Sequence, residues 1–293
     1  MKHVAFIGLG RMGHGMAGRY VDAGFTVALW NRSKAKGEDL VARGARWAAS
    51  PADAAKGADA VVTMVADDEV SRSVWLGKDG AAAALNKGAL AIECSTVSYR
   101  HALDMSRELN SRGLTYIDCP VTGLPDTAAS GELTLLVGAD PADLEKARPF
   151  LTPISSTIRH FGAIGTGTVY KLINNLLGAI QIAGLAEGIA IAEQAGLDMK
   201  LVQEAVATGA AASPQVIRHS RRMVARDFAD IGFTPTLRHK DVVYAVALAE
   251  SLLAAPTVMS RAVVDAYRQA KAVAPDDDEG KMIEIVSKPK RPK

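Results

Sequence analysis

Cysteine is almost absent from this chain of 293 residues, which contains only Cys94 and Cys119. A disulfide framework is therefore excluded as the stabilising device, and a reduced, cytoplasmic protein is expected. Each cysteine ends a candidate strand, so both are interpreted as small buried hydrophobes. The six histidines form no cluster with them at the spacing of a zinc site, and no metal is expected.

The sequence also lacks an excess of charge of one sign. It has 34 basic and 32 acidic residues, a net charge of +2. Residues 287–293 hold four cations and no acid, and without them the net charge would be −2. The basic excess therefore belongs to the C-terminal end, which is expected to be a disordered tail, and no nucleic-acid surface is predicted.

No hydrophobic run predicts a signal sequence or a membrane span. The apolar residues 4–7 are too few for a signal sequence and are followed by a glycine turn. The longest apolar stretch, 172–192, is interrupted by Asn174, Asn175, Gln181 and Glu187. We therefore expect it to be a buried helix of a globular protein and not a membrane segment.

The first half of the chain alternates short apolar runs with helical stretches. Strands are predicted at 4–7, 26–30, 60–65, 89–93, 115–118, 133–137 and 157–160, and helices at 12–23, 34–43, 69–75, 99–112 and 142–151. The strands contain few polar residues, as in a parallel sheet covered on both faces. The alternation predicts an α/β fold with a doubly wound parallel sheet of the Rossmann type.

The second half contains helical patterns only. The first helix is predicted at about 168–195, and others at 200–208, 214–225, 240–253 and 256–272. We expect residues 1–163 to form a Rossmann domain and 164–286 an all-α domain. The long helix would join them, and 287–293 would form the tail.

A phosphate-binding loop follows the first predicted strand. Its glycines have the GxGxxG spacing, directly after a strand and at the start of a helix. Gly8 would permit the turn, Gly10 the approach of the pyrophosphate, and Gly13 close packing of the helix. The residues predicted to bind the cofactor here are Gly8, Leu9, Gly10, Arg11, Met12 and Gly13.

The end of the second strand favours NADP, although NAD remains possible. An Asp or Glu at this place usually bonds the ribose hydroxyls of NAD. The sequence instead reads Asn31-Arg32-Ser33-Lys34. Arg32 could grip a 2′-phosphate with two hydrogen bonds and Ser33 could add a third. The alternative is an ordinary solvated basic turn.

A lysine and two amides lie early on the long helix. Lys171 and Asn175 are four residues apart and share a helix face, and Asn174 lies beside them. A lysine flanked by apolar surface is expected to have a lowered pKa, which suits proton exchange with a carbonyl or alcohol oxygen. From the residues alone, a solvated lysine at a helix start remains equally open.

The chain resembles the β-hydroxyacid dehydrogenases, which include 3-hydroxyisobutyrate dehydrogenase, tartronate semialdehyde reductase and plant-type glyoxylate/succinic semialdehyde reductases. The resemblance covers about residues 1–275. It rests on Phe6–Gly13, Ser95-Thr96, Asp118–Gly123, Gly131–Thr134, Gly165–Asn175, and Phe233 with Lys240-Asp241.

The resemblance implies a role for each matched residue. Lys171 would be the catalytic acid/base, and Asn175 an amide that orients the lysine or the substrate. The substrate-binding residues would be Ser95, Thr122, Gly123 and Asn174. Further cofactor-binding residues would be Asn31, Arg32, Ser33, Met64, Val65, Ala66, Thr96, Phe233 and Lys240. A homodimer or homotetramer formed through the helical domain is also implied.

Two departures from the family pattern bear on the substrate. Leu124 stands where the family usually has a second glycine after Gly123, and Tyr99 where a proline is common. The isobutyl group of Leu124 could narrow the pocket, so the substrate cannot be taken from the family.

The leading hypothesis is an NADP-dependent oxidoreductase that acts on a small β-hydroxyacid or its semialdehyde. An imine reductase on the same scaffold is one alternative, although such enzymes usually lack the lysine. A non-catalytic dinucleotide-binding protein is the other. The acidic run Asp276–Glu279 is interpreted as a solvated turn.

Overall fold

The computed structural model describes residues 2–255 and 257–287. The chain divides into two compact units, Met1–Lys171 and Leu172–Lys293, here called the sheet unit and the helical unit. The sequence placed this boundary at 163. Of the predicted tail, residues 288–293 lie outside the described residues, as does Pro256, where a helix was predicted to begin.

Nine strands of the described residues form a single sheet, and all seven predicted strands are present. The strands are β1 His3–Ile7, β2 Thr26–Trp30, β3 Arg46–Trp47, β4 Ala60–Thr63, β5 Leu90–Glu93, β6 Thr115–Asp118, β7 Val121–Thr122, β8 Leu133–Gly138 and β9 Ser155–Gly162. Their order is β3-β2-β1-β4-β5-β6-β8-β7, with β9 paired to β8. The first six strands have the order of a dinucleotide-binding sheet. In such a sheet the chain builds strands outward in one direction up to β3, and then returns to the centre and continues on the other side of β1 with β4.

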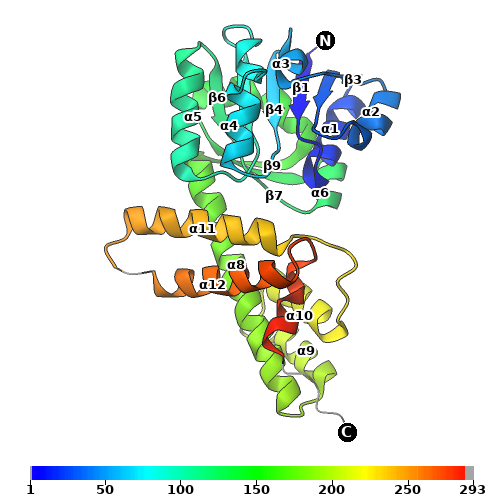
Figure 1. The fold of residues 1–293 in the computed structure, drawn as a ribbon, viewed down its shortest axis with the longest axis vertical. Coiled ribbons are helices and arrows are strands. Elements are labelled where there is room, and N and C mark those ends of the chain that lie inside the picture. The colour runs from blue at the N-terminus through cyan, green and yellow to red at the C-terminus, as the bar shows by residue number, and fades with distance from the viewer. Residues whose placement is uncertain (1, 256, 288–293) are drawn as a thin grey trace. The chain divides into compact units, whose positions relative to one another are not determined.

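Helices cover both faces of this sheet (Figure 1). Helices α1 Arg11–Asp22, α2 Glu38–Ala42, α6 Pro125–Ser130 and α7 Pro141–Leu151 contribute to one core, and α3 Pro51–Ala55, α4 Asp68–Leu76 and α5 Tyr99–Ser111 to the other. Side chains alternate along each strand. Accordingly, Val4 and Phe6 of β1 enter the first core, while Ala5 and Ile7 enter the second. Both cysteines are buried, as predicted.

One part of the sheet is not parallel. Strand β8 runs antiparallel to β6 and to β7, while β9 is again parallel to β8. After β6 the chain turns back through the two-residue β7 and the six-residue α6. A parallel neighbour would need a full crossover connection, usually a long helix. Strands β3 and β7 were missed because two residues show no periodicity.

The helical unit is built around the long helix α8. Its helices are α8 Thr166–Gln194, α9 Met199–Thr208, α10 Pro214–Ala225, α11 Pro235–Leu252, α12 Val258–Val273 and α13 Met282–Val286. Helix α8 starts in the sheet unit and is long and apolar enough to cross a membrane by length and composition alone. In the chain itself, 56% of that apolar window is buried, with Ala179, Ile182 and Ala186 fully enclosed. Such burial is expected of a core helix.

Helix α11 begins five residues before its predicted start at Lys240. The Thr234 side chain accepts the N–H of Leu237 at 3.3 Å, and Pro235 occupies the first helical position. A threonine cap followed by proline is a strong helix start that the apolar pattern alone did not reveal. Phe233 therefore lies just before the helix, and Lys240 lies inside it.

The prediction of a solvated turn at Asp276–Glu279 is wrong for its last two residues. Asp278 is 0% exposed and Glu279 is 2% exposed. Glu279 opens the short 3-10 helix η4 Glu279–Lys281, which precedes α13. Sequence cannot distinguish such a segment from a surface turn, because its cationic partners lie far away along the chain.

Candidate active site

The phosphate loop connects β1 to α1 at the point where the strand order reverses. Gly8 has a φ of +99°, and a Cβ atom there would overlap the carbonyl oxygen of Met64. A Cβ atom on Gly13 would overlap the carbonyl oxygen of Gly8. Both positions therefore require glycine for the packing of the protein itself, independently of any ligand.

Gly10 is glycine for a different reason. Its φ of −78° suits any residue, and a Cβ atom there would have no heavy atom within 4 Å. It caps α1, whose first turn has no acidic side chain and no side-chain cap. The start of α1 thus has no side-chain cap, and the space beside Gly10 is open for a pyrophosphate to approach. Leu9 is 1% exposed as a whole residue and its N–H donates to Asn31, so its predicted contact with the cofactor stays a prediction.

The loop after β2 is tied to the phosphate loop by Asn31. Its side-chain oxygen accepts the N–H of Leu9 at 3.1 Å, and its amide nitrogen donates to the carbonyl of Ser33 at 3.0 Å. Asn31 therefore shapes both loops. Arg32, Ser33 and Lys34 are exposed beside them, and residues 31–37 include no carboxylate.

The loops after β4 and β5 are joined by Ser95. Its hydroxyl accepts the N–H of Val65 at 2.7 Å, and its side chain is fully buried. Ser95 thus holds the Met64–Ala66 loop, while its predicted contact with substrate stays a prediction. Thr96, the next residue, is half-buried.

Glu93 supports this junction and was not predicted from the sequence. Its carboxylate, 1% exposed, accepts the Ser71 hydroxyl at 2.6 Å and the Trp75 indole N–H at 3.1 Å. It also accepts the backbone N–H of Ser95 at 3.0 Å. A lone acid at the end of an apolar strand was the available signal, because buried carboxylates require such partners.

Asp118 fixes the start of α8 in the same way. Its Oδ2 accepts the backbone N–H of Thr168 at 2.9 Å, and its Oδ1 accepts the Thr168 hydroxyl at 2.6 Å. Lys171 follows within one helical turn and is half-buried. Burial raises the pKa of Asp118 to about 6, against the opposing effect of the Thr168 hydrogen bonds.

The Thr122–Leu124 segment has a constrained backbone. Gly123 has a φ of +145°, and a Cβ atom there would lie 2.6 Å from Cδ2 of Leu133. The N–H of Leu124 donates to the Thr127 hydroxyl at 2.6 Å, and that hydroxyl donates back to the Leu124 carbonyl at 2.7 Å. The Leu124 amide is thus engaged within the chain, while its side chain is 39% exposed.

The amides of α8 are held within the helical unit. Asn175, 4% exposed, donates to Asp241 at 2.6 Å and accepts from Asn174 at 3.1 Å. The Lys240 ammonium lies 3.0 Å from the other oxygen of Asp241. Asp241 therefore brings Asn175 and Lys240 together, a role that the sequence analysis did not assign. Its only signal was its place next to Lys240 in the family motif.

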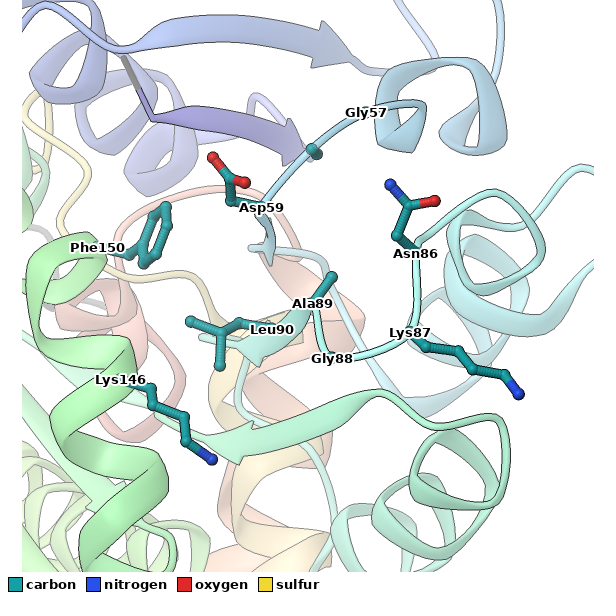
Figure 2. Close-up of a pocket in the computed structure, with 10 residues that line it drawn as sticks. Gly57, Asp59, Asn86, Lys87, Gly88, Ala89, Leu90, Lys146 and Phe150 are labelled. Carbon is teal, nitrogen blue, oxygen red and sulfur yellow. The ribbon is translucent and has the colours of Figure 1, made fainter.

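A pocket of about 400 Å³ lies at the amino ends of β4 and β5, away from the carboxyl ends that carry the predicted site (Figure 2). It is lined by Gly57–Asp59, by Asn86–Leu90, and by Lys146 and Phe150 of α7. These segments precede or begin β4 and β5, whereas Gly8 and Ser95 follow the carboxyl ends of strands. The pocket is therefore separate from the predicted site.

Gly10→Ala should separate folding from cofactor binding. Because the added methyl group meets no protein atom, the free energy of unfolding should change by less than about 1 kcal/mol. The same methyl group would occupy the space of the pyrophosphate, so the Kd of the dinucleotide, measured by fluorescence titration, should rise at least about tenfold. Gly188→Ala, on an open face of α8, is the matched control. Unchanged binding by the Gly10 variant would contradict the assignment.

The buried Asp118 should make stability depend on pH. Its pKa is about 6 in the folded chain and 3.8 ordinarily, so between these values the folded state holds a proton that the unfolded state has released. Its contribution to the free energy of unfolding therefore falls by about 2 kcal/mol as pH rises from 4 to 7. Urea unfolding of the parent and of Asp118→Asn should show their difference falling over this range. A difference in the free energy of unfolding that stays constant with pH would contradict the raised pKa of Asp118.

Comparison with known proteins agrees with this geometry. Residues 3–163 match the family model of the NAD binding domain of 6-phosphogluconate dehydrogenase, and residues 165–286 match that of the NAD-binding domain of NADP-dependent 3-hydroxyisobutyrate dehydrogenase. The first match includes the phosphate loop, and the second includes Lys171 and Asn175 of α8.

Curated relatives and solved structures agree with the family models. Glyoxylate/succinic semialdehyde reductase 2 of Arabidopsis thaliana is 31% identical over 94% of this chain and 76% of its own. The NAD-dependent L-serine dehydrogenase of Pseudomonas aeruginosa is 39% identical over 70% of this chain and 68% of its own. The structure of Mycobacterium tuberculosis 3-hydroxyisobutyrate dehydrogenase with L-serine is 29% identical, with a TM-score of 0.88 over 98% of this chain and 99% of that one. The chain therefore belongs to the family of NAD(P)-dependent hydroxyacid dehydrogenases and semialdehyde reductases that includes 3-hydroxyisobutyrate dehydrogenase.

Proposed function

We propose that the chain interconverts a small β-hydroxyacid and its semialdehyde, with NADP as the preferred cofactor and Lys171 as general acid/base. The observation that carries this proposal is the fixed position of the helix turn that bears Lys171. The first turn of α8 is bonded to the buried Asp118, so the lysine projects from a fixed point next to the carboxyl end of β6. Ligands of open α/β sheets bind at that edge.

Bound nicotinamide supplies or accepts the hydride at the reacting carbon. In reduction, Lys171 gives a proton to the carbonyl oxygen; in oxidation, it takes the proton from the hydroxyl. A lysine suits both directions because its ammonium also stabilises the negative charge that develops on that oxygen. Asn175, held by Asp241 at 2.6 Å, provides a fixed amide on the same helix face.

The substrate's carboxylate is assigned to Thr122 and Gly123. The Thr122 hydroxyl and the Gly123 amide are donors in a backbone held rigid by Leu124 and Thr127. The exposed Leu124 side chain replaces a glycine and adds apolar surface beside them. We therefore expect a preference for acids that carry a small apolar group.

The NADP preference is supported by the loop after β2. Arg32 and Ser33 are exposed there, and no carboxylate in residues 31–37 can bond the ribose of NAD. The relatives leave the matter open, since one family model is described as NADP-dependent and the serine dehydrogenase as NAD-dependent.

The proposal includes a homodimer or homotetramer formed through the helical unit. It is supported by exposed apolar side chains there, Ile191 at 69%, Leu201 at 62%, Val258 at 71% and Met259 at 61%. An interface between copies of the chain would remove these side chains from water.

Lys171→Met should abolish turnover while sparing cofactor binding. Loss of a general acid/base lowers kcat by about 10²- to 10⁴-fold. The Kd of NADPH should stay within about twofold, because the phosphate loop is untouched. Lys200→Met, at an exposed lysine of α9, is the control. The assay is NADPH oxidation with short semialdehydes and a cyclic imine. Full semialdehyde turnover by the Lys171 variant would exclude this mechanism, and turnover of the imine alone would favour an imine reductase.

Arg32→Ala should lower the affinity for NADPH and leave that for NADH unchanged. A charge-assisted hydrogen bond contributes about 1.5–3 kcal/mol, so the Kd of NADPH should rise about 10- to 100-fold. Isothermal titration of both cofactors measures the two constants. Arg100→Ala, at a 92% exposed side chain of α5, is the control. An equal loss for both cofactors would contradict recognition of the 2′-phosphate by Arg32.

A further inference from the structure

Glu279 is the centre of a buried polar network in the helical unit. Its carboxylate accepts two hydrogen bonds from Arg238, from Nε–H at 2.7 Å and from Nη2–H at 2.8 Å. It also accepts the Tyr267 hydroxyl at 3.1 Å. The three residues are at most 5% exposed, and they come from η4, α11 and α12. A two-point arginine–carboxylate pair of this kind fixes the guanidinium in one orientation.

The rest of the Arg238 guanidinium, its Nη1–H and its plane, contacts two residues of the candidate site. Its Nη1–H donates to the backbone carbonyl of Asn175 at 3.2 Å. Its guanidinium carbon lies 4.5 Å from the centre of the Phe233 ring, in a cation–π contact. One guanidinium thus joins the amide-bearing turn of α8 to the loop before α11.

The backbone of the same C-terminal segment holds that loop a second time. The N–H of Glu279 donates to the carbonyl of Phe233 at 2.9 Å. The buried carboxylate of Asp278 accepts the N–H of Gly232 at 3.0 Å. Phe233 is therefore held through its own carbonyl, through its neighbour's amide and through its ring.

The charges of this network compensate one another. Burial alone would raise the pKa of Glu279, but Arg238 beside it holds that pKa below its usual range. Burial has the opposite effect on His219, whose Nε2 lies 3.9 Å from Glu279, and lowers its pKa. Arg238 is thus the cation that balances Glu279, and removing either member would leave the other charge buried and unpaired.

We propose that Glu279 and Arg238 are positioning residues that set the placement of Phe233, predicted to bind the cofactor, relative to Asn175, predicted to orient the substrate, and so the fit of the substrate against the cofactor. This inference rests on the proposed function for its kinetic consequence. A planar guanidinium meets the carboxylate, the Asn175 carbonyl and the ring at once, whereas the ammonium of a lysine cannot. Substrate binding should therefore depend on the shape of residue 238 as well as its charge.

Arg238→Lys and Glu279→Gln test this proposal by kinetics and by amide hydrogen exchange. Each should raise the KM for the semialdehyde about tenfold or more, because small displacements of binding groups are costly. Each should also speed exchange in residues 230–241. Glu193→Gln, which breaks the 2.9 Å pair with Arg226 in the same unit, should leave both measurements near those of the parent. A KM and an exchange rate equal to those of this control would overturn the proposal.

Tyr267→Phe is a milder variant that tests the same proposal if Arg238→Lys and Glu279→Gln do not fold. It removes one hydrogen bond to Glu279 and keeps the ion pair, so KM should rise about two- to threefold, with faster exchange at 230–241. An unchanged KM and an unchanged exchange rate would overturn the proposal. If the parent protein reduces no semialdehyde at all, the proposed function fails, whereas the exchange comparison still tests the positioning by Glu279 and Arg238.

Discussion

The hydrogen bonds between Asp118 and Thr168 are the interaction on which the placement of Lys171, the proposed acid/base, depends. Asp118 ends β6, and its two oxygens receive the amide and the hydroxyl of the same residue in the first turn of α8. Gly167 packs so tightly there that a Cβ atom would lie 3.0 Å from the Leu136 carbonyl carbon. Helix α8 consequently starts at one defined point at the edge of the sheet, and Lys171 follows within a turn.

Buried carboxylates hold three segments of the structure in place. Glu93 bonds the segment after β5, Asp118 the start of α8, and Glu279 the first turns of α11 through Arg238. Each is almost fully buried, and each accepts at least one hydrogen bond from a residue distant in the sequence. Burying such a charge adds little net stability, but losing one of its partners is costly. These groups therefore act mainly by specifying position.

The phosphate loop and the main strands could be predicted because their signals are local. Gly8 and Gly13 lie at fixed spacing next to an apolar strand, and this spacing is visible in the sequence even though the contact that requires Gly8 comes from the distant Met64. The start of α11 was missed because the cap formed by Thr234 and Pro235 lies outside the apolar period. The direction of β8 was missed because pairing depends on the path of the connecting chain.

The sequence by itself determined the α/β and all-α halves, the dinucleotide loop, the basic turn at Arg32 and the lysine with its amides on α8, since periodicity and motif spacing encode them. Only the tertiary structure decided that Ser95 holds the Val65 loop, that Asp241 orients Asn175, and that Glu279 is buried against Arg238. The physical reason is that a side chain's burial and partners depend on residues brought together by folding. In the Glu279–Arg238 pair, the two partners are 41 residues apart.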